Sequence, residues 1–209
     1  MRLLSLFLCI YAGAAMSAPT AGSGTENFDA TPPGALPPGW ISGVTGMGSP
    51  KWAVDSEPDA PSAPQVLRQS GSGTFPWAVK QDSSLGDGFV QVRFKPVSGK
   101  QDQAGGVVWR WQSGMTYYVA RANANENNVS LYYTTLGIRS TIKYVDAPVA
   151  RGVWHTLRTE FAATRIRVWL DGKLYIEAED AHIRDPGAVG VWTKADSVTL
   201  FDDFSFGAR

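Results

Sequence analysis

The chain has 209 residues, of which 44% are hydrophobic, 18% charged and 11% aromatic, and its 19 basic side chains balance its 19 acidic ones. This balance gives no strong electrostatic field, so we expect no binding to nucleic acid or to an acidic membrane surface. Eight Trp, 22 Gly and 13 Pro favour short strands joined by turns and exclude a disordered tail or a helical bundle.

The N-terminus has the pattern of a secretory signal peptide. Arg2 precedes an apolar run from Leu3 to Met16, which is too short to span a bilayer, and no other run is long enough to form a transmembrane segment. We predict cleavage after Ser17, with a cut after Ala14 as the alternative. The predicted organisation is a signal peptide (1–17), a linker (18–24) and one domain (25–209), and the protein is expected to be secreted or periplasmic.

The only cysteine, Cys9, lies within the predicted signal peptide. Its removal would leave a mature protein without a disulfide, a Cys-ligated metal or a Cys nucleophile. Lipid attachment at Cys9 is the alternative, but bulky Phe7 and Leu8 precede it where small residues would be expected.

The remaining elements are predicted to be short strands. Glu26 to Asp29 forms a first strand, and Pro and Gly then interrupt the chain as far as Pro76, which leaves only short edge pieces at 52–54 and 65–67. From Gly88 onward the residues alternate between apolar and polar, which predicts a series of strands at 89–95, 105–111, 117–122, 129–135 and 139–145.

The clearest unit of the chain is a hairpin that follows a strand at 154–161. Asp171-Gly172 separates strands at 165–170 and 173–178, and Asp-Gly between alternating runs is a strong hairpin signal. Strands at 189–193 and 198–206 close the chain, and no segment carries a helical apolar stripe. The sequence therefore predicts an all-β, antiparallel sandwich or barrel.

Catalytic signatures are mostly missing. The two histidines, His155 and His182, form no His-Glu-x-x-His motif, and no Gly-x-Ser-x-Gly motif occurs. Glycoside hydrolysis needs two carboxyl groups about 5 to 9.5 Å apart. Glu160 and Glu177 are the candidates, although a solvated strand end is the simpler explanation for Glu177.

Carboxylates near the predicted first and last strands suggest a metal site. If these strands are neighbours, Glu26 or Asp29 could join Asp202 or Asp203, and oxygen ligands suit calcium. A structural calcium ion is the one cofactor that this pattern suggests, and no cofactor is firmly predicted. The alternative is that these carboxylates are simply solvated.

Aromatic and basic residues fall on the same predicted strands. About half of them should face the core of a sandwich, and the other half would form an outer face on which sugar rings stack. Cross-strand aromatic pairing that only stiffens the sheet is the alternative, and the residues leave the two open. The residues concerned are Trp109, Arg110, Trp111, Tyr117, Tyr118, Arg121, Tyr132, Tyr133, Trp154, Trp169 and Trp192.

Six motifs across about residues 25–207 follow one another in an order typical of a known fold: 105–110, 117–123, 152–157, 168–173, 190–197 and 201–204. Together they resemble concanavalin A-like (laminin-G-like) jelly-roll domains, nearest to the 3-keto-disaccharide hydrolase domain family. The resemblance implies a two-sheet jelly roll acting on oxidised disaccharides and glucosides, with Arg110 matching an arginine of that family. Where the family has a Gly-Tyr-Glu-x-Gln strand, residues 117–121 carry no carboxylate, which argues against hydrolysis.

We therefore predict a secreted domain that binds a carbohydrate on a concave sheet face. Basic side chains would recognise hydroxyl groups and aromatic ones would stack on the sugar, although a shift of one position along a strand would exchange the two faces. The alternatives are a glycosidic-bond hydrolase or lyase of the 3-keto-disaccharide type and a structural envelope or matrix module. The predicted contacts are Arg110, Tyr118, Arg121, Trp192 and Lys194.

Overall fold

The computed structural model describes residues 22–208. All helices and strands described in this range are β-strands, as the sequence predicts, and none is a helix. No helix that could cross a membrane by its length and apolar character occurs within residues 22–208. The predicted signal peptide with Cys9, and most of the predicted linker, lie outside the described residues.

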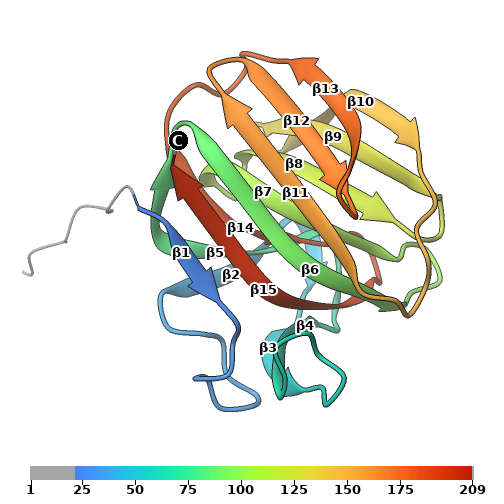
Figure 1. Ribbon diagram of the computed structural model, residues 1–209. Coiled ribbons are helices and arrows are strands. Elements are labelled where there is room, and N and C mark those ends of the chain that lie inside the picture. Colours follow the sequence, from blue (N-terminus) through green and yellow to red (C-terminus); the bar gives the residue numbers. More distant parts are fainter. Residues whose placement is uncertain (1–21, 209) are drawn as a thin grey trace, which may run out of the picture.

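The strands form two antiparallel sheets stacked face to face (Figure 1). The eight-stranded sheet has the order β13 (Lys173–Glu179), β12 (Arg165–Leu170), β11 (His155–Ala162), β6 (Gly88–Ser98), β15 (Val198–Ala208), β4 (Gln65–Gln69) and β3 (Trp52–Ser56), with β1 (Gly24–Glu26) also paired to β15. The seven-stranded sheet has the order β10 (Ile138–Asp146), β9 (Asn128–Thr135), β8 (Thr116–Asn123), β7 (Ala104–Ser113), β14 (Gly187–Trp192), β5 (Ser72–Leu85) and β2 (Trp40–Ser49). The all-β sandwich is confirmed.

The hairpin predicted at Asp171-Gly172 is confirmed. These two residues have φ values of 51° and 78° and connect β12 to β13, as a two-residue turn requires. In β12, Ile166, Val168 and Leu170 are buried and the residues between them are more exposed. The alternating apolar residues from which the strand is predicted are therefore the ones that it buries in the core.

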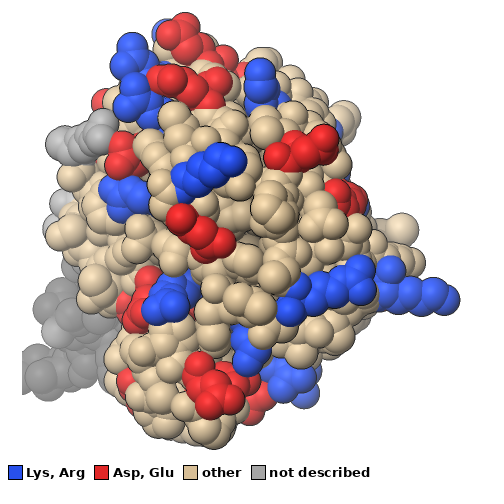
Figure 2. All heavy atoms as spheres, turned by 45° about the vertical axis from the view of Figure 1, so that its right-hand side comes forward, with Lys and Arg blue, Asp and Glu red and all other residues tan. Residues whose placement is uncertain are grey.

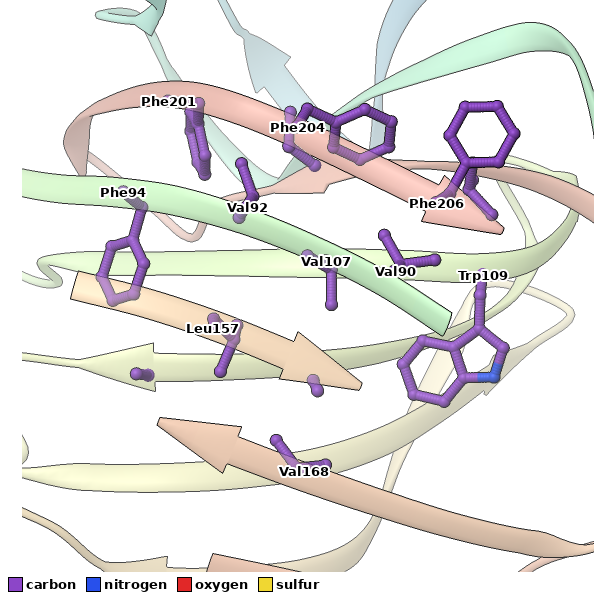
Figure 3. Packing of buried hydrophobic residues seen from close by; sticks show 14 of the residues in the cluster. Val90, Val92, Phe94, Val107, Trp109, Leu157, Val168, Phe201, Phe204 and Phe206 are labelled. Carbon is purple, nitrogen blue, oxygen red and sulfur yellow. The ribbon is translucent and has the colours of Figure 1, made fainter. Parts of the chain in front are cut away.

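The main core lies between the two sheets (Figure 3). Val90, Val92 and Phe94 of β6 point toward Val107 and Trp109 of β7, and all five are fully buried. Complete burial of a large apolar side chain stabilises a fold by about 1.5–3 kcal/mol. The alternating residues of β6 and β7 thus fix which face of each sheet is turned inward.

Two long strands were not predicted from the sequence, which favours only short edge pieces before Pro76. β2 and β5 pair along most of their length despite the glycines of β2 and Pro76 of β5. A Cβ at Gly43 would lie 2.6 Å from the ring of Trp77 on β5, so the absent side chain makes room for the indole. Glycine there reflects cross-strand packing, which local sequence does not reveal.

The first strand is also displaced from its predicted position. β1 ends at Glu26, and the next residues form a turn in which Phe28 has φ 65° and accepts a hydrogen bond from Thr31 N at 3.1 Å. β1 nevertheless pairs with β15, the last strand, which is the neighbour that the calcium hypothesis assumes.

The charged side chains are mixed on the surface. Figure 2 shows acidic and basic side chains interspersed over the face in view. Many of them form ion pairs on the outer side of the eight-stranded sheet, such as Arg167 with Glu177 at 2.8 Å.

Candidate functional site

A second apolar cluster lies on the outer face of the seven-stranded sheet, that is, on the side turned away from the eight-stranded sheet. In β7 and β8, Val107 and Ala120 belong to the main core, whereas their neighbours Val108 and Val119 belong to this second cluster. Because successive side chains of a strand point to opposite faces, the two clusters lie on the two sides of one sheet. The second cluster contains Trp77, Val79, Val108, Tyr117, Val119, Tyr132 and Trp192, with Ile41, Phe75 and Trp111 packed against it.

The strand register aligns polar and aromatic side chains on this outer face. Arg121 on β8 pairs with Gly106 on β7, and Gly106 pairs with Trp192 on β14. On the other side, Arg121 pairs with Ser130 on β9, which pairs with Tyr144 on β10. Arg121 and Trp192 are therefore two strands apart in one cross-strand row, about 10 Å by strand spacing, with a glycine between them.

Four charged side chains form what we call the charge network: Asp102, Arg121, Glu126 and Lys194. Arg121 donates to Asp102 Oδ1 at 3.1 Å and to Glu126 Oε2 at 2.6 Å. Lys194 Nζ lies 2.8 Å from Asp102 Oδ2 and 3.8 Å from Glu126 Oε1. The side chains of Arg121 and Asp102 are only 2% and 3% exposed, whereas Lys194 and Glu126 are 26% and 35% exposed. The network thus has a buried base and an accessible rim.

Neutral polar side chains hold the network in place. Asn128 Nδ2 donates to Glu126 Oε2 and to the Tyr144 hydroxyl, both at 2.8 Å. Ser130 Oγ donates to Asn128 Oδ1 at 2.9 Å, and Asn123 Nδ2 donates to Asp102 Oδ1 at 2.5 Å. Because these groups are bonded to one another, their orientation is fixed before any ligand arrives.

The network keeps Glu126 ionised. Burial alone would raise the pKa of Glu126, but the hydrogen bond from Asn128 and the charges of Arg121 and Lys194 outweigh burial and lower it below its ordinary value. At neutral pH Glu126 is a hydrogen-bond acceptor, and Lys194 beside it is a donor. Together they can recognise hydroxyl groups.

An aromatic floor of Phe75, Tyr132 and Trp192 adjoins the network. Phe75 stacks on Trp192 with ring centroids 5.6 Å apart, and the Tyr132 hydroxyl accepts a hydrogen bond from Arg121 at 3.3 Å. The guanidinium of Arg139 covers the rings of Phe75 and Tyr132 at 4.4 and 4.2 Å from their centroids. The outer face thus places apolar rings directly beside hydrogen-bonding groups.

Three of the five predicted contacts meet on this face. Arg121 and Lys194 belong to the charge network, and Trp192 belongs to the aromatic floor, where it is fully buried by its neighbours. Tyr118 points the opposite way, into the core, where it stacks on Trp109 with ring centroids 5.3 Å apart. Its hydroxyl donates to Asp180 and accepts from Ile183 N at 3.1 Å, so this polar group has hydrogen-bond partners inside the protein.

Arg110 lies away from the outer face, at a bulge of β7. It has φ 45°, and the pairing of β7 shifts around it. Its side chain, which is 4% exposed, donates to Gly86 O at 2.8 Å, Ile183 O at 2.7 Å and Ala163 O at 2.9 Å. Arg110 therefore joins three chain segments, and we leave it and Tyr118 out of the candidate site.

The two candidate catalytic carboxylates lie on the outer side of the other sheet. Glu160 pairs with Arg158 at 2.9 Å, and Glu177 pairs with Arg167 at 2.8 Å. In the strand register Arg167 stands between Glu160 and Glu177. The structure brings neither carboxylate together with Arg121, Trp192 or Lys194.

The predicted calcium ligands are held by hydrogen bonds. Asp202 accepts from Ser62 N at 2.8 Å and Ser62 Oγ at 2.7 Å, and Asp29 accepts from Gln65 N at 3.1 Å. Glu26 accepts from Phe28 N, and Asp203 lies 4.0 Å from Arg93. Within residues 22–208, no three His, Cys, Asp or Glu side chains are grouped so as to hold a metal ion. Calcium binding stays a prediction.

Solved structures with the same arrangement of sheets identify the fold. The carbohydrate-binding module CBM66 from Bacillus subtilis matches with a TM-score of 0.68 at 19% identity, covering 81% of this chain and 96% of that chain. The β-glucanase of Bacillus licheniformis matches with a TM-score of 0.57 at 16% identity, covering 91% and 100%. The fold is the concanavalin A-like jelly roll.

This jelly roll also matches the laminarinase from Rhodothermus marinus, with a TM-score of 0.59 at 14% identity, covering 88% of this chain and 95% of that chain. At such identities the likeness concerns the fold alone. No family model matches the sequence, and a search among curated proteins finds no match. The resemblance to the 3-keto-disaccharide hydrolase family therefore stays a prediction.

Several residues of the outer face were missed by sequence reasoning. Asp102 and Glu126 lie just outside predicted strands, where alternation assigns no face, and Phe75 lies in the segment where only edge pieces are predicted. Arg139 begins a predicted strand but has no local signal of its position over the rings. The spacing of Asn123, Glu126 and Asn128 around the β8–β9 turn is the one signal that could have pointed to a polar cluster.

Proposed function

We propose that the protein binds a carbohydrate on the outer face of its seven-stranded sheet. The observation that carries this proposal is the contact between the charge network and the aromatic floor. A sugar offers hydroxyl groups to fixed donors and acceptors and an apolar C–H surface to aromatic rings, and a binding site needs both. Lys194 and Glu126 supply the accessible polar groups, and the partly exposed Phe75 supplies the ring, since Tyr132 and Trp192 are buried.

The pre-ordered state of the face supports binding. Arg121 is held by two carboxylates and a tyrosine hydroxyl, and Asn128 bonds both Glu126 and Tyr144. A site whose side chains are already fixed loses little conformational entropy when a ligand binds. Among the structural neighbours, CBM66 is described as a carbohydrate-binding module, which supports this ligand class at the level of fold.

Hydrolysis of a glycosidic bond, including the 3-keto-disaccharide type, is the alternative function. A general acid must carry a proton near neutral pH, which requires a raised pKa. Glu126 has a lowered pKa instead, and Asp102 contacts both cations of the network. These contacts favour binding over hydrolysis. Incubation of the pure protein with natural and 3-keto disaccharides tests the alternative, because release of a monosaccharide would make it an enzyme.

The test of binding is a screen on a broad glycan array followed by calorimetry on the best ligand. We expect Lys194→Met to weaken binding about tenfold or more, because a charged hydrogen bond to the ligand is lost. Lys95→Met is the matched control, since Lys95 is 19% exposed and pairs with Glu57 at 3.5 Å on the eight-stranded sheet. No binding to any glycan would contradict the function, and equal losses in the two variants would contradict the face.

We also propose that the protein is secreted, because a glycan ligand would be encountered outside the cytoplasm. The expected cut follows Ser17. N-terminal sequencing of the protein exported by its host should therefore begin at Ala18, and an intact N-terminal Met1 on the mature protein would contradict secretion by this route.

A further inference from the structure

Arg139 lies over the aromatic floor, and no carboxylate within the described residues 22–208 pairs with it. It is on β10, opposite Thr134 of β9, and its half-buried guanidinium covers the rings of Phe75 and Tyr132. The ring of Trp192 is also within reach, at 5.8 Å from its centroid. The guanidinium therefore occupies the position where a sugar ring would approach the floor.

No acceptor in the described chain serves this guanidinium. Within residues 22–208 Arg139 makes ring contacts but no hydrogen bond or ion pair, and its Nη1 is buried without a partner. The two more deeply buried arginines differ, because Arg110 reaches three carbonyl oxygens and Arg121 reaches two carboxylates. Leaving a half-buried cation unpaired is costly, so the position of Arg139 calls for an acceptor from outside the chain.

The surrounding charges point to an anion as that acceptor. Arg121 and Lys194 are paired with Asp102 and Glu126, which leaves Arg139 as the cation beside the aromatic floor that these carboxylates do not pair with. Burial lowers the pKa of Arg139, and the charge of Arg121 lowers it further. A guanidinium nevertheless stays charged at any physiological pH.

We propose, building on the carbohydrate-binding function above, that the bound glycan is anionic and that Arg139 binds its carboxylate or sulfate group. Nη1 of Arg139 is buried, but Nε and Nη2 are not among the buried nitrogens without a partner, and the N–H edge that these two form matches two oxygens of a carboxylate or sulfate. The charge network beside it then holds the hydroxyl groups of the same sugar.

The experiment measures binding of three oligosaccharides that share backbone and length: a neutral glucan, its glucuronic-acid counterpart and a sulfated glucan. We expect one of the two acidic ligands to bind at least about tenfold more tightly than the neutral one. The preference should shrink as salt is added, because the contact is ionic. The acidic ligand that binds more tightly distinguishes carboxylate from sulfate recognition.

Two variants locate the preference. Arg139→Gln keeps an amide donor and removes the charge, so it should abolish the preference for the acidic ligand. Arg158→Gln is the matched control, since Arg158 lies 4.0 Å over the Phe89 ring on the eight-stranded sheet, and it should keep the preference. Melting curves check folding, and if Arg139→Gln does not fold, Arg139→Lys and the salt series of the native protein decide.

Three results would overturn the inference while leaving carbohydrate binding intact. The first is equal binding of the neutral and acidic ligands. The second is a preference for the acidic ligand that is kept in Arg139→Gln. The third is tighter binding of the neutral ligand by Arg139→Gln than by the native protein, which would mean that Arg139 only covers the ring of Trp192. Absence of binding to these ligands and to the whole glycan array would instead contradict the proposed function.

Discussion

The charge network should stabilise the fold, and Arg121→Met tests this. The substitution keeps much of the side-chain volume but removes hydrogen bonds to Asp102, Glu126 and Tyr132. Removing one partner of a buried ion pair typically costs about 3–5 kcal/mol, because the other charge is left uncompensated. Asp102 keeps Lys194 at 2.8 Å, so we expect the lower end, about 3 kcal/mol.

Urea and thermal unfolding measure this loss. For a domain of this size each 1 kcal/mol lowers Tm by about 2–4 °C, so the expected fall in Tm is roughly 6–12 °C. Arg167→Met is the control, because Arg167 pairs with Glu177 at the same kind of distance, 2.8 Å, but is 36% exposed. An exposed pair should cost less than about 1 kcal/mol. Equal losses in the two variants would refute the reasoning from burial.

Three further outcomes are expected. Arg110→Met should lower the free energy of unfolding by about 3 kcal/mol or more, measured in urea, because three carbonyl oxygens lose their donor, and it should leave the affinity for a glycan unchanged once folded. Glu126 has a lowered pKa in the folded state, so its contribution to stability is present above its unfolded pKa of about 4.3 and is lost as pH falls through the folded value; Glu126→Gln should therefore destabilise the protein more at pH 7 than at pH 3. The calcium hypothesis for Glu26, Asp29, Asp202 and Asp203 predicts a higher Tm in calcium than in chelator, and equal values would reject it.

Much of the fold follows from local sequence because the strands after Gly88 are amphipathic or end in unambiguous turns. β12 and its Asp171-Gly172 turn carry their structure in their own residues. β2 and β5 do not, since Gly43 is tolerated in a strand only because Trp77 of the neighbouring strand fills the space above it. Such strands are defined by their partners, which a single sequence does not display.

The candidate site likewise contains residues that local sequence places correctly and residues that it does not. Arg121 and Trp192 lie on regular strands, and their shared face can be reached from alternation. Tyr118 lies on the same strand as Arg121, three positions away, so alternation itself places the two side chains on opposite faces and is at odds with the prediction that both contact one ligand. Arg110 was displaced by a bulge, which breaks the alternation on which the prediction rests.

The pKa shifts of the carboxyl groups support the proposal of binding rather than catalysis. Among the carboxyl groups of residues 22–208 whose pKa departs from its ordinary value, only that of Asp202 is raised, mainly by burial. Asp202 lies on β15 of the eight-stranded sheet and accepts hydrogen bonds from Ser62. The aromatic floor and the charge network lie on the outer face of the other sheet. The carboxyl group with the raised pKa and the face proposed to hold a sugar are therefore on different sheets, which is in line with the proposal of binding over hydrolysis.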